Sequence, residues 1–271
     1  GRQETSTPAH RDSNGYQGYN WFQMSQPALV HYSDSGDHAN DLFYLVYGAD
    51  RYIEFKRRSS TAREYIARNG AAGVIAYLDG DPQALLPNGH SDYWMYVDQH
   101  GVRTYFFGDT NTGAAAWQIW KIVDPAGNVA YVGDATTAST AISAGYTADG
   151  GISKAFDSAG RRYCYTYSGS TIGGVKRLEQ VLVETDAGGG WGDCGAETLV
   201  AKVDFTFYSS DVSGEGKIGD LKLVKITTPL TDSGVVQERE QYYRYYTASY
   251  TNSNSLRGEP HQIKLVVGPE G

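Results

Sequence analysis

The chain has 271 residues, of which 33 are Gly and 22 are Tyr, and its formal net charge is −8. Binding to nucleic acid and anchoring to an anionic membrane both need a basic surface, which this composition does not favour. No apolar run approaches the roughly 20 residues that span a bilayer as a helix. Glycine for tight turns, with Tyr, Val, Ile and Thr for pleated strands, predicts an all-β fold.

The first 28 residues are polar and rich in turn-forming residues, so we expect residues 1–28 to form an irregular N-terminal arm. No proline-rich or charged linker interrupts residues 29–271, which we expect to form one β region. The chain starts without Met or an apolar leader and ends just after a strand-like run. We therefore expect it to be a fragment of a longer chain.

The first predicted elements are hairpins. Residues 42–47 and 51–56 flank a short loop that contains Gly48, which predicts two paired strands. Residues 64–68 and 74–78 flank Asn69-Gly70 in the same way, with a short helix at 61–67 as the alternative.

The central part of the sequence repeats one pattern three times: an apolar strand, an Asp-Xaa-Xaa-Gly turn, and a second strand that ends in Tyr or Phe. The three copies span Tyr93–Phe107, Ile119–Val132 and Ile152–Tyr167. Their turn residues are Asp98 and Gly101, Asp124 and Gly127, and Asp157 and Gly160. An Asp that opens a turn accepts backbone N–H bonds, and a Gly that closes it adopts a positive φ. A hairpin that cannot bury its own face must stack on its neighbours, so the pattern predicts a continuous sheet.

After residue 168 the repeat loosens. Further strands are predicted at 175–185, 199–208, 221–227, 242–250 and 262–267. A glycine-rich loop, residues 186–195, follows the first of them and contains Cys194. Cys194 and Cys164 either form a disulfide that pins this loop to the strand Tyr163–Tyr167 or remain two inert thiols.

At these residues the sequence resembles the RHS/YD-repeat family of large bacterial secreted and surface proteins. That family repeats an aliphatic residue, Asp-Xaa-Xaa-Gly, Asn or Arg, and a later Tyr. IVDPAGNVAYV and AFDSAGRRYCYTY match this form, and YVDQHGVRTYFF matches less closely. The resemblance implies stacked antiparallel hairpin repeats that form a spiralling sheet or partial β-shell. Such shells enclose a toxin or present adhesive surfaces.

One further family feature is an autocleaving Asp-Pro-Xaa-Gly element, and Asp124-Pro125-Ala126-Gly127 has those four letters. This element lies inside a repeat that itself requires Asp-Xaa-Xaa-Gly. The position therefore favours a structural turn over a cleavage site.

Residues with catalytic or metal-binding chemistry are scattered. No pair of the six histidines has metal-ligand spacing on one element: His10, His31, His38, His90, His100 and His261. The Asp79-Gly80-Asp81 loop lacks the regular spacing of a calcium loop. We therefore expect no catalytic residue, cofactor or metal in this segment.

The sequence predicts a structural β-repeat segment of a secreted or cell-surface protein that serves as shell, adhesin or filament material. Two alternatives remain open: an extracellular carbohydrate-binding module, and the cage part of an RHS-type toxin-delivery polypeptide. The expected partners are the remainder of the parent chain or other copies of the same chain, in an oligomer or fibre, with surface polysaccharide as a further partner. Neither nucleic acid nor a membrane span is expected.

Overall fold

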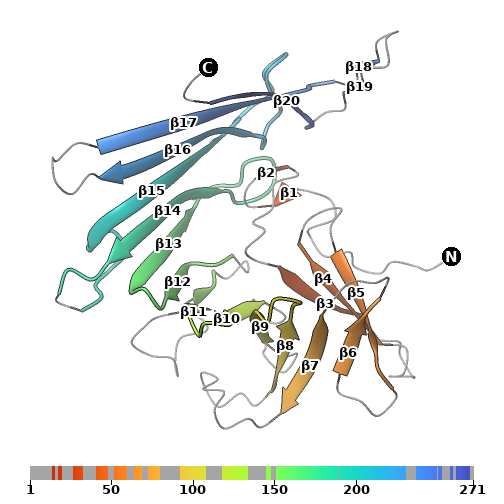
Figure 1. Cartoon of the computed structure of the whole chain (residues 1–271). Helices are drawn as coiled ribbons and strands as arrows, with labels where there is room; N and C mark the ends of the chain where they lie inside the picture. The colour runs from red at the N-terminus through yellow and green to blue at the C-terminus, as the bar shows by residue number, and fades with distance from the viewer. Residues whose placement is uncertain are drawn as a thin grey trace. The chain divides into compact units, whose positions relative to one another are not determined.

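The computed structural model describes residues 14–15, 18–19, 27–32, 41–47, 52–59, 64–68, 73–79, 92–107, 118–133, 145–147, 151–188, 190–229, 236–248, 250–251, 257–258 and 261–268. These residues form strands and turns with almost no helix, as the composition predicts (Figure 1). Sixteen of the described strands form one open antiparallel sheet in which neighbours follow chain order, except that the last strand pairs with the fourth from the end. No helix in the described part of the chain is long and apolar enough to cross a membrane.

The chain divides into two compact units, Gln23–Arg162 and Gly1–Phe22 with Tyr163–Gly271. Each is described by itself. Within the expected N-terminal arm, the structure describes a small pair of strands, β1 (Asn14–Gly15) and β2 (Gly18–Tyr19), together with residues 27–28. The arm itself stays a prediction.

Ten strands lie in the described part of the unit Gln23–Arg162, apart from the start of β13. They are β3 (Ala28–Tyr32), β4 (Leu42–Val46), β5 (Tyr52–Arg57), β6 (Glu64–Ala67), β7 (Val74–Asp79), β8 (Asp92–Val97), β9 (Arg103–Phe107), β10 (Ile119–Val123), β11 (Val129–Val132) and β12 (Lys154–Asp157). Both early hairpins are confirmed, β4 with β5 and β6 with β7. The alternative helix at 61–67 is wrong in its described part, because Glu64–Ala67 is strand paired on both sides.

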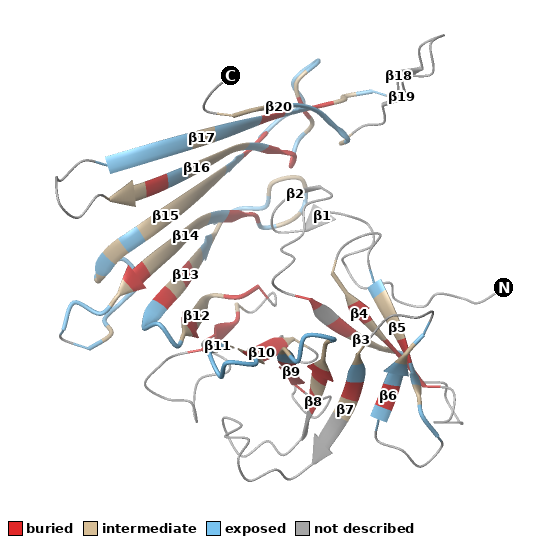
Figure 2. Ribbon diagram, in the orientation of Figure 1, coloured by how far each residue is buried: buried red, intermediate tan, exposed pale blue. Residues whose placement is uncertain are grey.

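Aromatic side chains show that the sheet of this unit curls on itself. Four strand spacings separate β4 from β8, which is about 19 Å in a flat sheet. Yet the ring centroids of Phe43 on β4 and Trp94 on β8 lie 4.4 Å apart. Tyr65 on β6 also packs edge-on against Phe43, at 4.7 Å. Side chains from β3 to β10 thus meet in one buried core, which also includes Leu29, Phe55, Ile75, Tyr96 and Phe106 (Figure 2).

The part of the other unit from Tyr163 onward contains the four longest described strands, β14 to β17, together with shorter ones. They are β13 (Arg161–Tyr167, shared at its first two residues with the preceding unit), β14 (Leu178–Thr185), β15 (Thr198–Phe207), β16 (Leu221–Pro229), β17 (Val236–Tyr245), β18 (Tyr250–Thr251), β19 (Arg257–Gly258) and β20 (Ile263–Val267). β18 and β19 pair only with each other among the described residues. A small core of Phe207, Tyr208, Leu221, Tyr243 and Tyr245 lies at one end of these strands.

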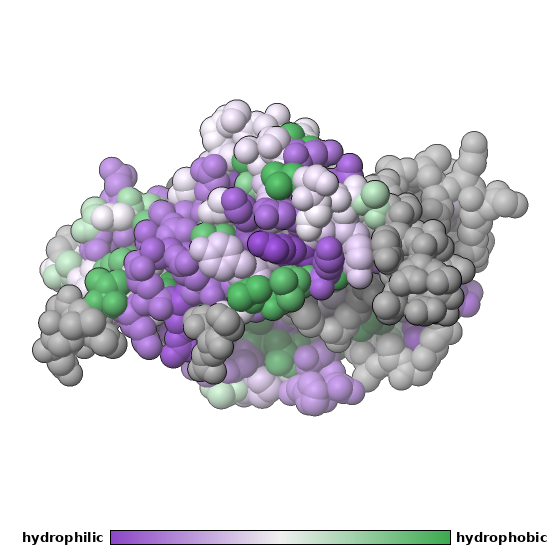
Figure 3. Space-filling view, turned by 90° about the horizontal axis from the view of Figure 1, so that it is seen from above, coloured by the Kyte–Doolittle hydropathy of each residue, from purple (hydrophilic) through white to green (hydrophobic). Residues whose placement is uncertain are grey.

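One face of β14–β17 carries a row of charged and polar pairs across the strands. Asp204 accepts a hydrogen bond from Gln180 at 2.8 Å and pairs with Lys202 at 2.8 Å. Lys225 pairs with Glu238 at 2.8 Å, and this contact raises the pKa of Lys225. Cross-strand pairs of opposite charge stabilise a sheet modestly. Hydrophobic and hydrophilic side chains also intermingle on the face seen in Figure 3.

Candidate functional site: a repeated Asp-Xaa-Xaa-Gly turn

The three predicted turn pairs all lie at the tips of consecutive hairpins. The first tip joins β8 to β9, the second β10 to β11, and the third β12 to β13. In the first, the N–H of Gly101 donates to the carbonyl of Asp98 at 3.1 Å, and the N–H of Asp98 donates to the carbonyl of Val102 at 3.1 Å. These two bonds and a φ of 81° at Gly101 define a type I turn closed by a left-handed glycine.

The second and third tips repeat this geometry. Gly127 donates to the carbonyl of Asp124 at 3.0 Å, and Gly160 donates to that of Asp157 at 3.1 Å. Their φ angles are 88° and 73°. Glycine is needed because an L side chain is disfavoured in this conformation.

The aspartate carboxylate holds each turn from inside. In the first turn Oδ1 of Asp98 accepts the N–H of His100 at 2.8 Å and that of Val102 at 2.9 Å. In the third, Oδ1 of Asp157 accepts the N–H of Ala159 at 3.0 Å and that of Arg161 at 3.1 Å. Each Asp therefore satisfies backbone donors that the tight turn leaves unpaired.

In the second and third turns, the side chain of the residue after the glycine also contacts the aspartate carboxylate. Nδ2 of Asn128 donates to Oδ2 of Asp124 at 2.8 Å, and Nε of Arg161 donates to Oδ2 of Asp157 at 2.8 Å. The Asn128 amide and backbone bonds lower the pKa of Asp124. Both oxygens of each carboxylate are thus occupied within the turn. This arrangement suits a structural turn and not a general base.

Neighbouring tips contact one another. A Cβ added to Gly101 would lie 3.6 Å from Cγ of Pro125, so the first tip adjoins the second. Ser158 joins the third tip to the second, because its N–H donates to the carbonyl of Val129 at 2.7 Å and its Oγ accepts the N–H of Val129 at 3.1 Å. The three turns form a continuous row within one unit.

An open hollow of about 500 Å³ lies between the second and third tips. It is lined by Ile122, Asp124, Asn128, Val129, Ala130, Asp157, Ser158, Ala159 and Arg161. Its two carboxylates are the ones already bonded inside their own turns. The hollow is therefore a consequence of stacking two hairpins.

Cys164 on β13 and Cys194 in the glycine-rich loop form a disulfide, with their Cα atoms 6.0 Å apart. Two glutamates hold the same loop. Oε1 of Glu184 accepts the N–H of Gly195 at 2.7 Å, and Glu197 accepts the N–H groups of Ala187 and Gly192 at 3.2 and 2.6 Å. Glu184 is only 1% exposed and is not among the site residues that the sequence predicts. Its place in a long alternating strand gave no signal of burial.

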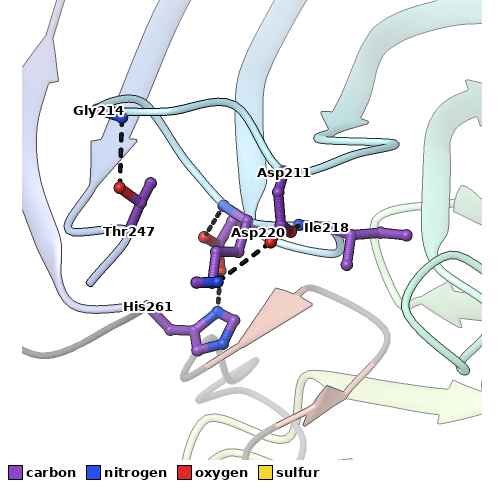
Figure 4. Close-up of polar contacts among 7 residues, drawn as sticks. Asp211, Gly214, Ile218, Asp220, Thr247 and His261 are labelled. Carbon is purple, nitrogen blue, oxygen red and sulfur yellow. Dashed lines mark hydrogen bonds and ion pairs between the residues drawn. The ribbon is translucent and has the colours of Figure 1, made fainter. Parts of the chain in front are cut away.

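A second polar cluster lies where the loop between β15 and β16 meets the turn before β20 (Figure 4). Oδ1 of the buried Asp220 lies 2.7 Å from Nδ1 of His261, and Oδ2 accepts the N–H of Lys217 at 2.8 Å. Oδ1 of Asp211 accepts the N–H of Ile218 at 2.9 Å, and Nζ of Lys217 donates to Oδ2 at 3.1 Å. These bonds, that from Ile218 foremost, lower the pKa of Asp211.

His261 has a φ of 68°, which is uncommon for a residue with a side chain. Its bond to Asp220 and its N–H bond to the carbonyl of Tyr246, at 3.2 Å, hold it in that conformation. The N–H of Gly214 donates to Oγ1 of Thr247 at 3.3 Å and ties the same loop to the end of β17. The cluster thus anchors a loop to the start of the last strand.

Of the remaining histidines, the structure describes His31 on β3 and His100 in the turn between β8 and β9. His31 stacks on Phe43 at 4.6 Å, and exposed His100 contacts Gln99 at 3.1 Å. His10, His38, His90 and the Asp79-Gly80-Asp81 loop beyond Asp79 lie outside the described residues.

No protein-family model matches the sequence, and no curated protein matches it. Three solved structures resemble the fold. The Tc holotoxin pore of Photorhabdus luminescens, with the mutation TccC3-D651A, has a TM-score of 0.45 and 11% identity over 88% of this chain and 14% of its own. The N-terminal domain of effector protein SpvB from Salmonella typhimurium has a TM-score of 0.37 and 10% identity over 98% of this chain and 95% of its own.

The third is a porin-like protein from Bacteroides uniformis, with a TM-score of 0.33 and 12% identity over 91% of this chain and 80% of its own. This chain spans only 14% of the length of the first of the three. Because the identities and TM-scores are low, we infer nothing about function from these likenesses.

Proposed function

We propose that this chain is a structural β-repeat segment of a secreted or cell-surface protein of the RHS/YD-repeat type. In this proposal it serves as shell, adhesin or filament material and carries no catalysis. The observation that carries the proposal is the row of three hairpin tips with one hydrogen-bond design. Because both carboxylate oxygens of Asp124 and Asp157 accept hydrogen bonds within their own turns, these turns suit a structural role in a repeated hairpin.

The disulfide supports the proposed location. Disulfides form and persist in oxidising compartments such as the periplasm, the cell surface and the medium. Cys164 and Cys194 close a loop of 30 residues and pin an otherwise exposed glycine-rich segment. This bond would not persist in a reducing cytosol.

The carbohydrate-binding alternative has less support. Stacking on sugar rings needs aromatic faces that lie in one plane, and the exposed Tyr52 meets Tyr44 at an interplanar angle of 67°. This pair packs edge to face, as neighbouring aromatic rings in a sheet do.

The proposal is tested on cells that make the parent protein. An antibody against the exposed loop at residues 190–196 should bind intact cells or the medium, and a protease added outside should remove the signal. Electron microscopy of the purified parent protein should show a shell or filament. A signal that appears only after lysis, or a parent protein that is a small compact monomer, would contradict the proposal.

A further inference from the structure

A carboxylate and the two cysteine sulfurs meet beside β14. Sγ of Cys164, Sγ of Cys194 and a carboxylate oxygen of Glu184 all lie within 4.8 Å of one another, the one such group of three among the described residues. Cys164 is 2% exposed and Glu184 is 1% exposed, whereas Cys194 lies on the exposed loop. Two donors are therefore fixed in the interior, and the third is on a segment that can adjust.

The local backbone directs Glu184 to this place. The pairing of β14 with β15 shifts its register between Val183 and Glu184. Such an irregularity re-aims the side chain beside it. The Gly195 N–H bond at 2.7 Å then fixes Oε1 and leaves Oε2 as the oxygen nearest Cys164.

The contact between Oε2 of Glu184 and Sγ of Cys164 measures 3.6 Å. A disulfide sulfur has no proton, so in the oxidised protein this contact is not a hydrogen bond. A thiol could donate to the same oxygen, and a thiolate and a carboxylate at this distance could share a cation.

The distances suit tetrahedral zinc. Zinc lies about 2.3 Å from a sulfur ligand and about 2.0 Å from a carboxylate oxygen. At tetrahedral angles a sulfur and an oxygen ligand are then about 3.5 Å apart, and two sulfur ligands are about 3.8 Å apart. The observed 3.6 Å between Cys164 and Glu184 already agrees. Only the Cys194 sulfur must move, and it is on the exposed loop.

We infer that Cys164, Glu184 and Cys194 form a binding site for a divalent zinc-type cation once the disulfide is reduced, with a water molecule as the fourth ligand. Thiolate ligands favour zinc over magnesium and calcium. The site does not depend on the structural role proposed above. It gives the segment a second way to fasten the glycine-rich loop in a reducing environment.

The chemistry balances. A phosphine reductant and one water molecule convert the disulfide to two thiols and a phosphine oxide. The cation then displaces one proton from each thiol, and two protons are released to solvent. Oxidation of the two thiolates releases the cation and restores the disulfide, with two electrons passing to the oxidant.

The experiment uses the full 271-residue chain, reduced with a phosphine without air and titrated with Co²⁺, which occupies zinc sites and is coloured. We expect one Co²⁺ per chain, a near-ultraviolet sulfur-to-metal absorption, and displacement by Zn²⁺. Without reduction these signals should be absent. Zn²⁺ should also raise the melting temperature of the reduced chain, because a ligand that binds the folded state stabilises it.

Three variants test the ligands. Cys164→Ser should abolish the sulfur absorption at one equivalent, and Glu184→Gln should weaken Co²⁺ binding at least about tenfold. Glu197→Gln is the matched control, because Glu197 holds the same loop by backbone N–H bonds but is not part of the group of three. It should bind Co²⁺ as the unchanged chain does.

Two results would overturn the inference. One is reduced chain that takes up no Co²⁺. The other is that Glu184→Gln binds Co²⁺ as tightly as Glu197→Gln does. The same result is expected if the reduced chain unfolds and binds Co²⁺ through its thiols alone. Circular dichroism of the reduced chain identifies that second cause directly.

Discussion

Replacing the glycine of a turn tip by valine isolates the conformational part of the turn's stability. Gly127 and Gly160 have φ angles of 88° and 73°, and a Cβ added to either would meet no atom within 4 Å. The cost of a side chain there is therefore almost all backbone strain. A left-handed conformation costs an L residue roughly 1–2 kcal/mol, and β-branching adds to it. We expect Gly127→Val and Gly160→Val each to lower the free energy of unfolding by about 1–3 kcal/mol.

Urea unfolding, followed by tryptophan fluorescence, measures this loss as a lower midpoint with an unchanged slope. Ala126→Val and Ala159→Val are matched controls in the same two turns. Both alanines are exposed and neither has a positive φ. They should change stability by no more than about 0.5 kcal/mol. Gly127→Asn should cost less than Gly127→Val, since Asn tolerates the left-handed region. Equal midpoints for the glycine and alanine variants would show that the turns do not require glycine.

Three further predictions concern charge, the disulfide and the sheet edge. The bonds of Asp124 to Asn128 lower the pKa of its carboxyl. The stability that the carboxylate contributes is therefore present above the unfolded pKa of about 4 and is lost as pH falls through the lower folded pKa. Between neutral and acid pH, Asp124→Asn should lose less stability than the unchanged chain, and equal losses would contradict this. Intact mass should show no alkylated cysteine when the protein is treated without reductant, and two alkylated thiols would exclude the disulfide. Reduction should lower the free energy of unfolding by about 3–4 kcal/mol, because the disulfide closes a loop of 30 residues. β20 exposes Ile263, Leu265 and Val266 and pairs on one side only among the described strands, so light scattering should show concentration-dependent association. Leu265→Lys should reduce this association, whereas Ile226→Lys should not, because Ile226 on β16 is similarly exposed but pairs with β15 and β17. A monomer at high concentration would refute the edge argument.

The hairpins could be predicted from the sequence because their signals are local. An Asp-Xaa-Xaa-Gly turn makes its bonds within five residues, and alternation in the flanking strands needs only one exposed and one buried face. The helix considered at 61–67 failed because pairing of β6 with β5 and β7 outweighs local propensity.

Other features depend on distant residues and gave no local signal. The sequence predicts a strand at 242–250, but β17 begins at Val236 and ends at Tyr245. Its first half, Val236–Gln241, is polar, so no alternation marks it. That segment is strand because β16 pairs with it and Lys225 contacts Glu238 and Glu240. Glu184 likewise contacts Cys164 and Gly195, which lie elsewhere in the chain.

This difference between local turns and distant packing also explains the uneven repeat. The three aspartates lie 26 and 33 residues apart, yet their turns have one geometry. Because each tip is held by bonds from its own residues, the connection between one hairpin and the next can change length without altering the turn. The aromatic core makes the opposite demand, since Phe43 meets Trp94 only if the intervening strands curl by a fixed amount. Substitutions of the turn aspartates should therefore act mainly on one hairpin each, whereas substitutions in the aromatic cluster should act on the whole unit.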